Sequence, residues 1–267
     1  MKVECIHFDL DSVLYVQVNF LKNALRVCAM AMIEQGLRAT LDQAHAQLVA
    51  IRQTDANAGD HFDRLCHHFN GCCEPLIIAA GVEKYWDCKL GFMMPAPHAH
   101  PVLGRLAQQY PLTVISNGIP VKQAAKLFRI GLSQYFNQVD DSPAGRRPLF
   151  FATAKPDQAK PHPYLWQEAH KAVSCRFGRA IMVGDRYGTD MLGAKRLGMI
   201  TVKIDQGEHR HETLLQACQK WLDQPPTAWP SLLSTAELKE LMQPDYTIET
   251  LAALPAVVEK IEARLEI

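Results

Sequence analysis

Polar residues follow apolar segments at several points of this chain, and their types suit phosphoryl-transfer chemistry. Asp9 and Asp11 come after the apolar run Val3–Phe8. They are two positions apart, so their side chains can project from the same side of an extended segment. Close carboxylates repel each other, and keeping both ionised is costly without a cation. The pair predicts a cation site where one carboxylate attacks phosphorus while the other moves a proton.

Other predicted strands end in polar residues as well. Ser116 and Asn117 end one of them, and Asp185 follows the apolar run Ala180–Val183. Open α/β sheets bind ligands beyond the carboxyl ends of their strands, so we expect these residues to meet at one edge. A carboxylate cluster there suits Mg²⁺, which prefers oxygen ligands. Lys160 would offset the negative charge, and Ser116 would hydrogen-bond a phosphoryl oxygen.

Alternating strand and helix patterns are expected to position these residues. The alternation predicts an α/β fold with a doubly wound, mainly parallel, Rossmann-like sheet. The predicted strands are Val3–Phe8, Leu112–Ile115, Gln138–Val139, Ala180–Val183, Ile200–Ile204 and Tyr246–Ile248. The predicted helices are Val121–Phe128, Tyr164–Ala172, Met191–Leu197 and Leu254–Leu265. Ser142–Ala159 is rich in proline and shows no clean period, and Gln206–Pro244 is predicted to be helical pieces broken by prolines.

The segment from Gln17 to Met94 has helical periodicity with almost no strand-like alternation. The proline-rich stretch Pro95–Pro101 then marks a return to the main pattern. We therefore predict a core domain made of residues 1–15 and 95–267, with residues 16–94 as an inserted all-helical domain.

Composition narrows the functional classes. Lys plus Arg equals Asp plus Glu, at 28 each, so no basic field indicates nucleic-acid binding. No stretch approaches the roughly 18 apolar residues of a membrane helix, and the start is unlike a secretory signal. The eight cysteines are too sparse for a disulfide scaffold and are predicted to be mostly buried thiols. We expect a cytoplasmic protein that does not act at a membrane.

The motifs resemble those of the haloacid dehalogenase-like superfamily. In chain order they are Ile6–Leu14, Val114–Gly118, Lys160–Pro163, and Val183–Asp185 with Asp190. One Asp-x-Asp pair would be weak support, whereas four motifs in the family order and at family-like spacing are specific. Ser12 departs from the commoner Gly or Asp but removes no catalytic group. Lys155 is an alternative to Lys160, and the residues around Pro163 favour Lys160.

The resemblance implies roles for individual residues. Asp9 would be the nucleophile and a metal ligand, and Asp11 the general acid and base, with its backbone carbonyl on the metal. Ser116 and the amide of Asn117 would hold the phosphoryl group, and Lys160 would stabilise it. Asp185 would bind Mg²⁺ directly, and Asp190 through water, unless it only favours the start of a helix. The helical insertion resembles the family's cap of the C1 type.

The implied activity is Mg²⁺-dependent hydrolysis of a small phosphomonoester through an aspartyl-phosphate. A phosphomutase or phosphotransferase would keep the same residues, and a non-catalytic binding protein on this scaffold is a further alternative. A dehalogenase would need no metal and would not keep Asp11. Cys66, His67 and His68 with Cys72 and Cys73 fit no common zinc spacing, so cap packing is the preferred interpretation. The oligomeric state is left open.

Overall fold

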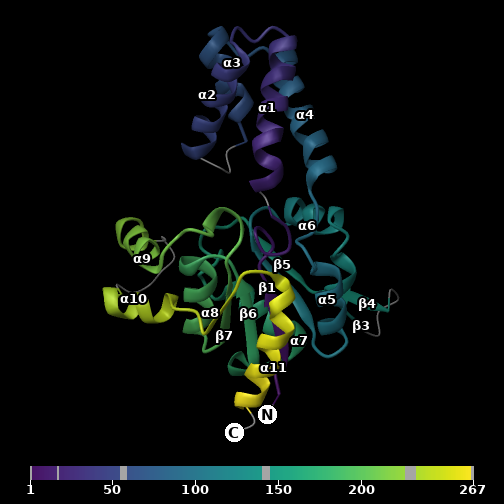
Figure 1. The fold of residues 1–267 in the computed structure, drawn as a ribbon, viewed down its shortest axis with the longest axis vertical. Coiled ribbons are helices and arrows are strands. Elements are labelled where there is room, and N and C mark those ends of the chain that lie inside the picture. Colours follow the sequence, from purple (N-terminus) through teal and green to yellow (C-terminus); the bar gives the residue numbers. More distant parts are fainter. Residues whose placement is uncertain (1, 17, 55–58, 140–144, 226–232, 266–267) are drawn as a thin grey trace. The chain divides into compact units, whose positions relative to one another are not determined.

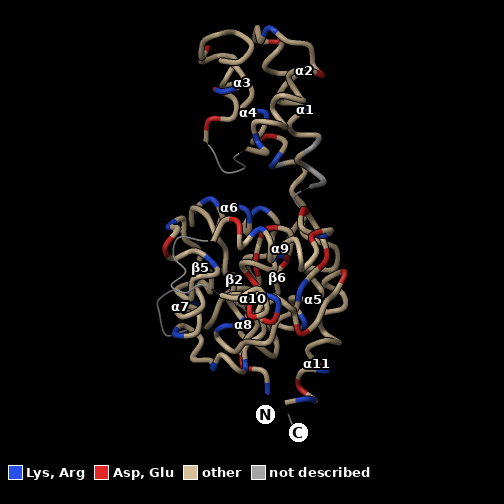
Figure 2. The backbone as a smooth tube through the Cα atoms, turned by 90° about the vertical axis from the view of Figure 1, so that its left-hand side faces the viewer, with Lys and Arg blue, Asp and Glu red and all other residues tan. Residues whose placement is uncertain are grey.

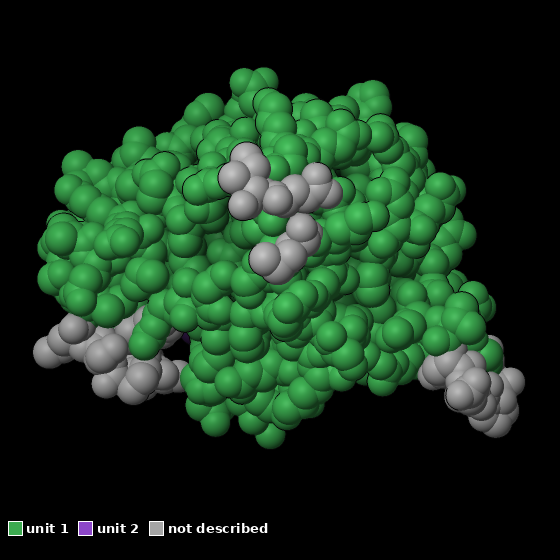
Figure 3. Space-filling view, turned by 90° about the horizontal axis from the view of Figure 1, so that it is seen from below, with its two compact units in different colours: residues 1–16, 94–267 green, residues 17–93 purple. Residues whose placement is uncertain are grey.

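The computed structural model describes residues 2–16, 18–54, 59–139, 145–225 and 233–265 (Figure 1). The chain divides into two compact units. The core unit comprises Met1–Val16 and Met94–Ile267, and the inserted unit comprises Gln17–Met93. Figure 3 shows the core unit in space-filling form, seen from below the view of Figure 1.

The core unit is built on a parallel sheet. In the described part of the chain six strands form it, in the order β5-β2-β1-β6-β7-β8, and every neighbouring pair is parallel. The strands are β1 Cys5–Phe8, β2 Leu112–Asn117, β5 Phe150–Thr153, β6 Ala180–Gly184, β7 Ile200–Ile204 and β8 Tyr246–Ile248. The chain builds outward from β1 in one direction and then in the other. This confirms the doubly wound, Rossmann-like sheet.

Helices cover the sheet. They are α5 Ala99–Ala107, α6 Pro120–Arg129, α7 Tyr164–Val173, α8 Leu192–Arg196, α9 Leu214–Asp223, α10 Thr235–Met242 and α11 Leu254–Leu265. Helices α7 and α8 bury Trp166 and Ala194 against residues of β1, β2 and β6. Helices α5 and α11 contact each other and cover the sheet from the other side in Figure 1. Strand β1 is buried along its whole length, as is usual for a central parallel strand.

Two parts of the core unit differ from the sequence prediction. The predicted strand Gln138–Val139 exists as β3, Asn137–Val139, but it pairs antiparallel with β4, Arg146–Pro148, in a separate sheet. Strand β5 lies inside the segment predicted to be irregular. The prolines around it concealed a four-residue, mainly apolar strand at the edge of the sheet, in which Phe150, Phe151 and Ala152 are partly buried and Thr153 is buried.

The stretch Pro95–Pro101 is also more regular than predicted. Helix α5 begins at Ala99, so His100 and Pro101 lie in its first turn and not in a loop. A proline is tolerated there because the first turn's amide groups have no helical partner. Just before it, Pro95 forms an antiparallel bridge with Tyr15, and the Ala96 amide donates to the Leu14 carbonyl at 2.7 Å.

The inserted unit is helical. It contains α1 Val18–Glu34, α2 Leu41–Thr54, α3 His61–Asn70 and α4 Pro75–Phe92. Buried residues including Met32, Leu48, Leu65 and Cys66 form its core. Of the residues weighed as zinc ligands, Cys66 is buried in this core, whereas His67, His68, Cys72 and Cys73 are exposed. Phe92, at the end of α4, lies outside this core and is 54% exposed.

Charged residues of both signs occur in both units, and the described cysteines include free thiols and a disulfide. Positive and negative residues are interspersed along both units (Figure 2). Among the described residues, no helix combines the length and apolar character needed to cross a membrane. Cys28, Cys66, Cys88 and Cys218 are buried thiols, as predicted, whereas Cys72 and Cys73 are exposed thiols. Cys5 and Cys175 depart from the prediction because they form a disulfide across a sequence separation of 170 residues.

Candidate active site

The sheet's order places a site at the carboxyl end of β1. Because β1 lies between β2 and β6, the chain's two directions of winding diverge there, which is where open α/β sheets bind ligands. Asp9 follows β1 and is 7% exposed, and its amide donates to the Val183 carbonyl at 2.9 Å. Ser116 near the end of β2 and Asp185 after β6 are both buried.

Lys160 joins two of the predicted acids. Its Nζ donates to Asp9 Oδ1 at 2.8 Å and to Asp190 Oδ1 at 2.6 Å, and it is 5% exposed. Burial alone lowers the pKa of Lys160, but the charges of Asp190 and Asp9 outweigh burial and raise it. Lys160 is therefore charged at neutral pH. Lys155, the alternative lysine, is exposed.

Asn117 fixes the backbone that carries this lysine. Its Oδ1 accepts from the Lys160 amide at 2.7 Å, and its Nδ2 donates to the Lys160 carbonyl at 3.0 Å. The Asn117 side chain thus aligns the third motif with the end of β2. Its use in phosphate binding would be limited to the backbone amide, as the resemblance implied.

Asp9, Asp185 and Asp190 form a buried carboxylate cluster. Each offers an oxygen, and these oxygens lie within 4.8 Å of one another. Burial raises the pKa of Asp9 to about 6, with Lys160 opposing and Asp190 adding to the rise. Burial, followed by the charges of Asp9 and Asp190, raises the pKa of Asp185 well above its usual value.

This cluster fits a divalent cation. Asp185 Oδ1 is buried, and within the described residues nothing donates a hydrogen bond to it. An orphaned buried carboxylate oxygen is costly unless a cation or donor satisfies it. The donor set is all oxygen, which suits Mg²⁺. The Asp11 side chain lies outside this set.

Asp11 is held by groups that sequence reasoning missed. Lys126 Nζ donates to its two oxygens at 2.6 and 2.9 Å, Gln123 Nε2 donates at 3.3 Å, and the Tyr15 hydroxyl donates to Oδ1. Burial alone raises the pKa of Asp11, but Lys126 and its other donors lower it below the ordinary value. One indication of these contacts was present in the sequence. Gln123 and Lys126 are three residues apart, so they lie on one face of α6, the helix that follows the second motif.

Asp190 is positioned by the turn after β6. It lies in a short π-helical turn, Tyr187–Met191, and its Oδ2 accepts from the Arg186 amide at 3.2 Å. Gly184 leaves room for it, because a Cβ there would be 2.4 Å from the Asp190 Cβ. π-turns of this kind occur frequently at functional sites. The location favours a role in the site over a simple helix-start preference.

Arg186 is a second missed residue. Its side chain is largely exposed, unlike the acids beside it. Partial desolvation alone lowers its pKa, but the nearby charges of Asp185, Asp9 and Asp190 raise it. The signal available in the sequence was its position directly after Asp185. It adds a cation to the rim of the carboxylate cluster.

Comparison with known proteins agrees with this geometry. Residues 3–198 match the haloacid dehalogenase-like hydrolase family, and residues 158–254 match a related HAD-hydrolase-like family. The chain belongs to the haloacid dehalogenase-like hydrolase family, which confirms the resemblance drawn from its motifs.

Within that family the chain is an enzyme, a hydrolase of the phosphatase type. It is 32% identical to the glyceraldehyde 3-phosphate phosphatase of Pyrococcus furiosus, over 88% of this chain and 94% of the relative. The glyceraldehyde 3-phosphate phosphatase of Methanocaldococcus jannaschii is also 32% identical, over 78% of this chain and 87% of the relative.

Solved structures share the fold at low sequence identity. A magnesium-bound HAD-hydrolase from Bacillus subtilis has a TM-score of 0.61 at 16% identity, covering 97% of this chain and 99% of its own. A HAD phosphatase from Thermococcus onnurineus has a TM-score of 0.59 at 19% identity, covering 96% and 97%. A 2-haloacid dehalogenase from Pseudomonas syringae scores 0.58 at 20% identity, covering 97% and 99%. A phosphatase and a dehalogenase score alike, so the fold does not discriminate between these chemistries.

Proposed function

We propose that this protein is a Mg²⁺-dependent phosphomonoesterase that uses Asp9 as a transiently phosphorylated nucleophile. The observation that carries the proposal is the buried charge group at the end of β1. Lys160 bridges Asp9 and Asp190, and the orphaned Asp185 Oδ1 lies in the same cluster. Such a group is costly to bury for structural reasons alone, which supports a functional role.

Asp9, Asp185 and Asp190 would hold the metal. Asp9 and Asp185 are the direct side-chain ligands in this proposal, and Asp190 acts through water while holding Lys160. When bound, Mg²⁺ supplies positive charge that offsets the carboxylates and the phosphoryl oxygens. The raised pKa values of Asp9 and Asp185 support this assignment because burial, and after it the neighbouring carboxylates, oppose their ionisation, and a bound cation would relieve that cost.

In the first step an Asp9 oxygen forms a bond to phosphorus, and the bond from phosphorus to the ester oxygen breaks. Asp11 gives a proton to the departing alkoxide. In the second step water attacks the aspartyl-phosphate, Asp11 takes a proton from that water, and inorganic phosphate is released. Lys160 and Ser116 hold the phosphoryl oxygens, so much of the catalysis comes from positioning and charge neutralisation.

Asp11 must change its protonation state in this cycle, and Lys126 bears on that change. The Lys126 ammonium favours the carboxylate form, so it supports the state that accepts a proton from water. Substrate binding would then have to weaken the contact between Lys126 and Asp11 before Asp11 can act as the acid. Lys126 is thus proposed to tune Asp11 and not to react.

The substrate is proposed to be a small phosphorylated compound of the glyceraldehyde 3-phosphate class. Relatives with that activity are about one-third identical over most of both chains. The exposed Arg186 beside the carboxylates could contact an anionic or polar group of such a substrate. The inserted unit is proposed to be the cap that excludes bulk water during the reaction. A cytoplasmic location and the absence of nucleic-acid partners stay predictions.

The test measures phosphate release from a panel of small phosphomonoesters that includes D-glyceraldehyde 3-phosphate, with Mg²⁺ and with EDTA. Wild type is compared with Asp9→Asn, and Asp157→Asn, an exposed carboxylate in the loop before Lys160, serves as the matched control. We expect Mg²⁺-dependent release by wild type and Asp157→Asn, and at least a 1,000-fold loss in folded Asp9→Asn, on the order seen for removal of a covalent nucleophile.

Several outcomes would contradict the proposal. Release that persists in EDTA or in Asp9→Asn would show that the hydrolytic site lies elsewhere. Transfer of the phosphoryl group to another position of the substrate, without free phosphate, would identify a mutase. A wild-type protein that binds phosphomonoesters but turns none over would support the non-catalytic alternative.

A further inference from the structure

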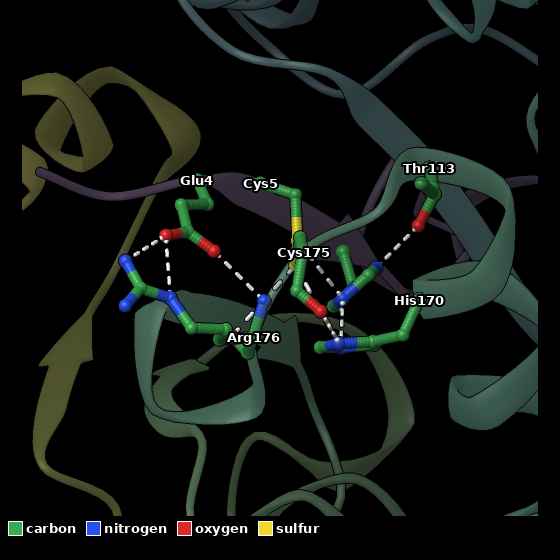
Figure 4. The surroundings of a disulfide bond; sticks show 7 residues. Glu4, Cys5, Thr113, His170, Cys175 and Arg176 are labelled. Carbon is green, nitrogen blue, oxygen red and sulfur yellow. Dashed lines mark hydrogen bonds and ion pairs between the residues drawn. A yellow bond between two sulfur atoms is a disulfide. The ribbon is translucent and has the colours of Figure 1, made fainter.

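A second cluster of polar side chains lies in the core, at the opposite end of β1 from Asp9. Cys5 and His7 come from β1, His170 comes from α7, and Cys175 follows that helix (Figure 4). Along the strand Cys5 lies about 13 Å and His7 about 7 Å from Asp9, and the two clusters share no residue. The cluster is therefore separate from the candidate active site, and the proposed function makes no use of it.

The cluster is convergent, and it is buried except at Cys175, which is partly exposed. Cys5 and His7 have no exposed surface, and His170 is 7% exposed. The two imidazole Nε2 atoms are 3.0 Å apart, and His7 Nε2 is 3.4 Å from Cys5 Sγ. One potential ligand atom from each of the four residues lies within 4.8 Å of the other three. An arrangement of two sulfurs and two imidazole nitrogens around one point is unusual for a purely apolar sheet face.

We propose that Cys5, His7, His170 and Cys175 form a tetrahedral binding site for a zinc-class divalent ion when the two cysteines are reduced. In this structure the cysteines are joined as a disulfide, so the disulfide and the metal complex are alternative states of one site. Conversion requires a thiol-type reductant: two electrons and two protons turn the disulfide into two thiols. Binding of the ion then displaces the two thiol protons.

The distances suit such an ion. Bonds of about 2.0 Å to nitrogen and 2.3 Å to sulfur place the ligand atoms of a tetrahedral zinc roughly 3.3–3.8 Å apart. Here His7 Nε2 is 3.4 Å from Cys5 Sγ and 3.0 Å from His170 Nε2, and His170 Nε2 is 4.0 Å from Cys175 Sγ. Small shifts of the two rings bring these distances into that range. The two sulfurs have to separate to about 3.8 Å once their bond is broken. Two thiolates balance the charge of the ion, so a buried complex carries no net charge.

The outer contacts also suit metal ligation. Ligating histidines usually donate their other ring N–H to a carbonyl or another oxygen, which fixes the ring. His170 Nδ1 lies 2.8 Å from the Cys175 carbonyl, which can only accept, so His170 Nε2 is left unprotonated. His7 Nδ1 lies 2.5 Å from the Thr113 hydroxyl. Because that hydroxyl can accept as well as donate, it can support the tautomer in which His7 Nε2 also faces the ion unprotonated.

A second contact holds the segments of the two cysteines together beside the disulfide. Glu4 precedes Cys5, and Arg176 follows Cys175. The Arg176 amide donates to Glu4 Oε2 at 2.8 Å, and its Nε donates to Glu4 Oε1 at 2.8 Å (Figure 4). These contacts join the segment after α7 to the start of β1 in addition to the bond between the sulfurs, so we expect the two cysteines to stay close when that bond is reduced.

The test uses Co²⁺ as a probe on full-length protein reduced with a phosphine. Thiolate-to-cobalt charge-transfer absorption arises only where sulfur binds the ion, so the all-oxygen carboxylate cluster does not contribute. We expect the band, together with the intense visible bands of tetrahedral cobalt, at one equivalent in reduced wild type. One equivalent of Zn²⁺ should abolish it, and oxidised wild type should lack it.

Variants identify the residues. Cys175→Ser should lose the band, whereas the matched control Cys72→Ser/Cys73→Ser, which removes exposed thiols of the inserted unit, should keep it. Thr113→Val preserves every ligand and removes only the hydroxyl contact, and it should weaken affinity about 10- to 100-fold. The proposal is overturned if reduced wild type shows no band, if Cys175→Ser keeps it at full intensity, or if the control loses it. If Cys175→Ser does not fold, unchanged affinity in Thr113→Val overturns it.

Discussion

Replacing Lys160 by methionine should destabilise the protein strongly. The side chains are similar in size, but the variant lacks the ammonium that lies 2.8 Å from Asp9 and 2.6 Å from Asp190. Both carboxylates are buried, so they would face each other without a cation. Removal of one partner from a buried ion group costs about 3–5 kcal/mol of the free energy of unfolding. We expect a loss of that size near neutral pH in the absence of Mg²⁺.

The sign of the pH dependence follows from Asp9. Its pKa is raised from 3.8 to about 6 in the folded protein. A carboxyl group with a raised folded pKa gives stability that is fully present below its unfolded pKa and is lost as the pH rises through its folded pKa. That loss amounts to about 3 kcal/mol for a shift of this size. Without Lys160 the pKa of Asp9 rises further, so the deficit of the variant should be largest near pH 8 and shrink toward about pH 5.

The assay is urea unfolding in EDTA at both pH values. Lys155→Met is the matched control, because Lys155 is an exposed lysine in the loop that leads to Lys160. It should unfold at nearly the same urea concentration as wild type, since exposed charges contribute little. Equal midpoints for the two variants at both pH values would refute the view that Lys160 neutralises a buried carboxylate cluster.

Three other perturbations have defined outcomes. Lys126→Met should raise the pKa of Asp11 by about 1–3 units, because the ammonium that opposes the effect of burial is then lost. The limb of the pH dependence of kcat that reports Asp11 should move to higher pH, and an unchanged profile would contradict this. Gly184→Ala should displace Asp190 and lower kcat on the order of 100-fold in a protein with normal circular dichroism, and full activity would show that this spacing does not matter. Leu48→Ala should cost the inserted unit about 2–5 kcal/mol in urea unfolding, and a change below 1 kcal/mol would indicate that its core relaxes around the cavity.

The sequence predicted the strands correctly where strand-like and helix-like patterns alternate regularly along the chain. The runs before Asp9 and Asp185 are apolar and short, as buried parallel strands require, so the strands and the edge they share could be predicted. Strand β5 escaped because prolines surround it. Strand β4 is exposed and begins with two arginines, so it has no hydrophobic period to detect.

The contacts that complete the sites depend on distant parts of the chain. Lys126 reaches Asp11 across a separation of 115 residues, and Cys175 reaches Cys5 across 170. Neither contact leaves a local pattern, because α6 and the turn after α7 obtain their positions from the sheet. Cysteine pairing in particular cannot be deduced from spacing alone. The prediction of buried thiols therefore failed at the pair that the fold brings together, and also at Cys72 and Cys73, which are free but exposed.

The bridge between Tyr15 and Pro95 bears on how this protein can be divided. The chain leaves the core unit and re-enters it at two points that are already hydrogen-bonded to each other. With respect to the core unit, the segment Gln17–Met93 is one long insertion between two neighbouring points of the chain. The entropy of closing a loop changes slowly with its length. A short turn can therefore replace this segment at little cost to core stability, which makes the inserted unit an exchangeable module on a self-contained scaffold.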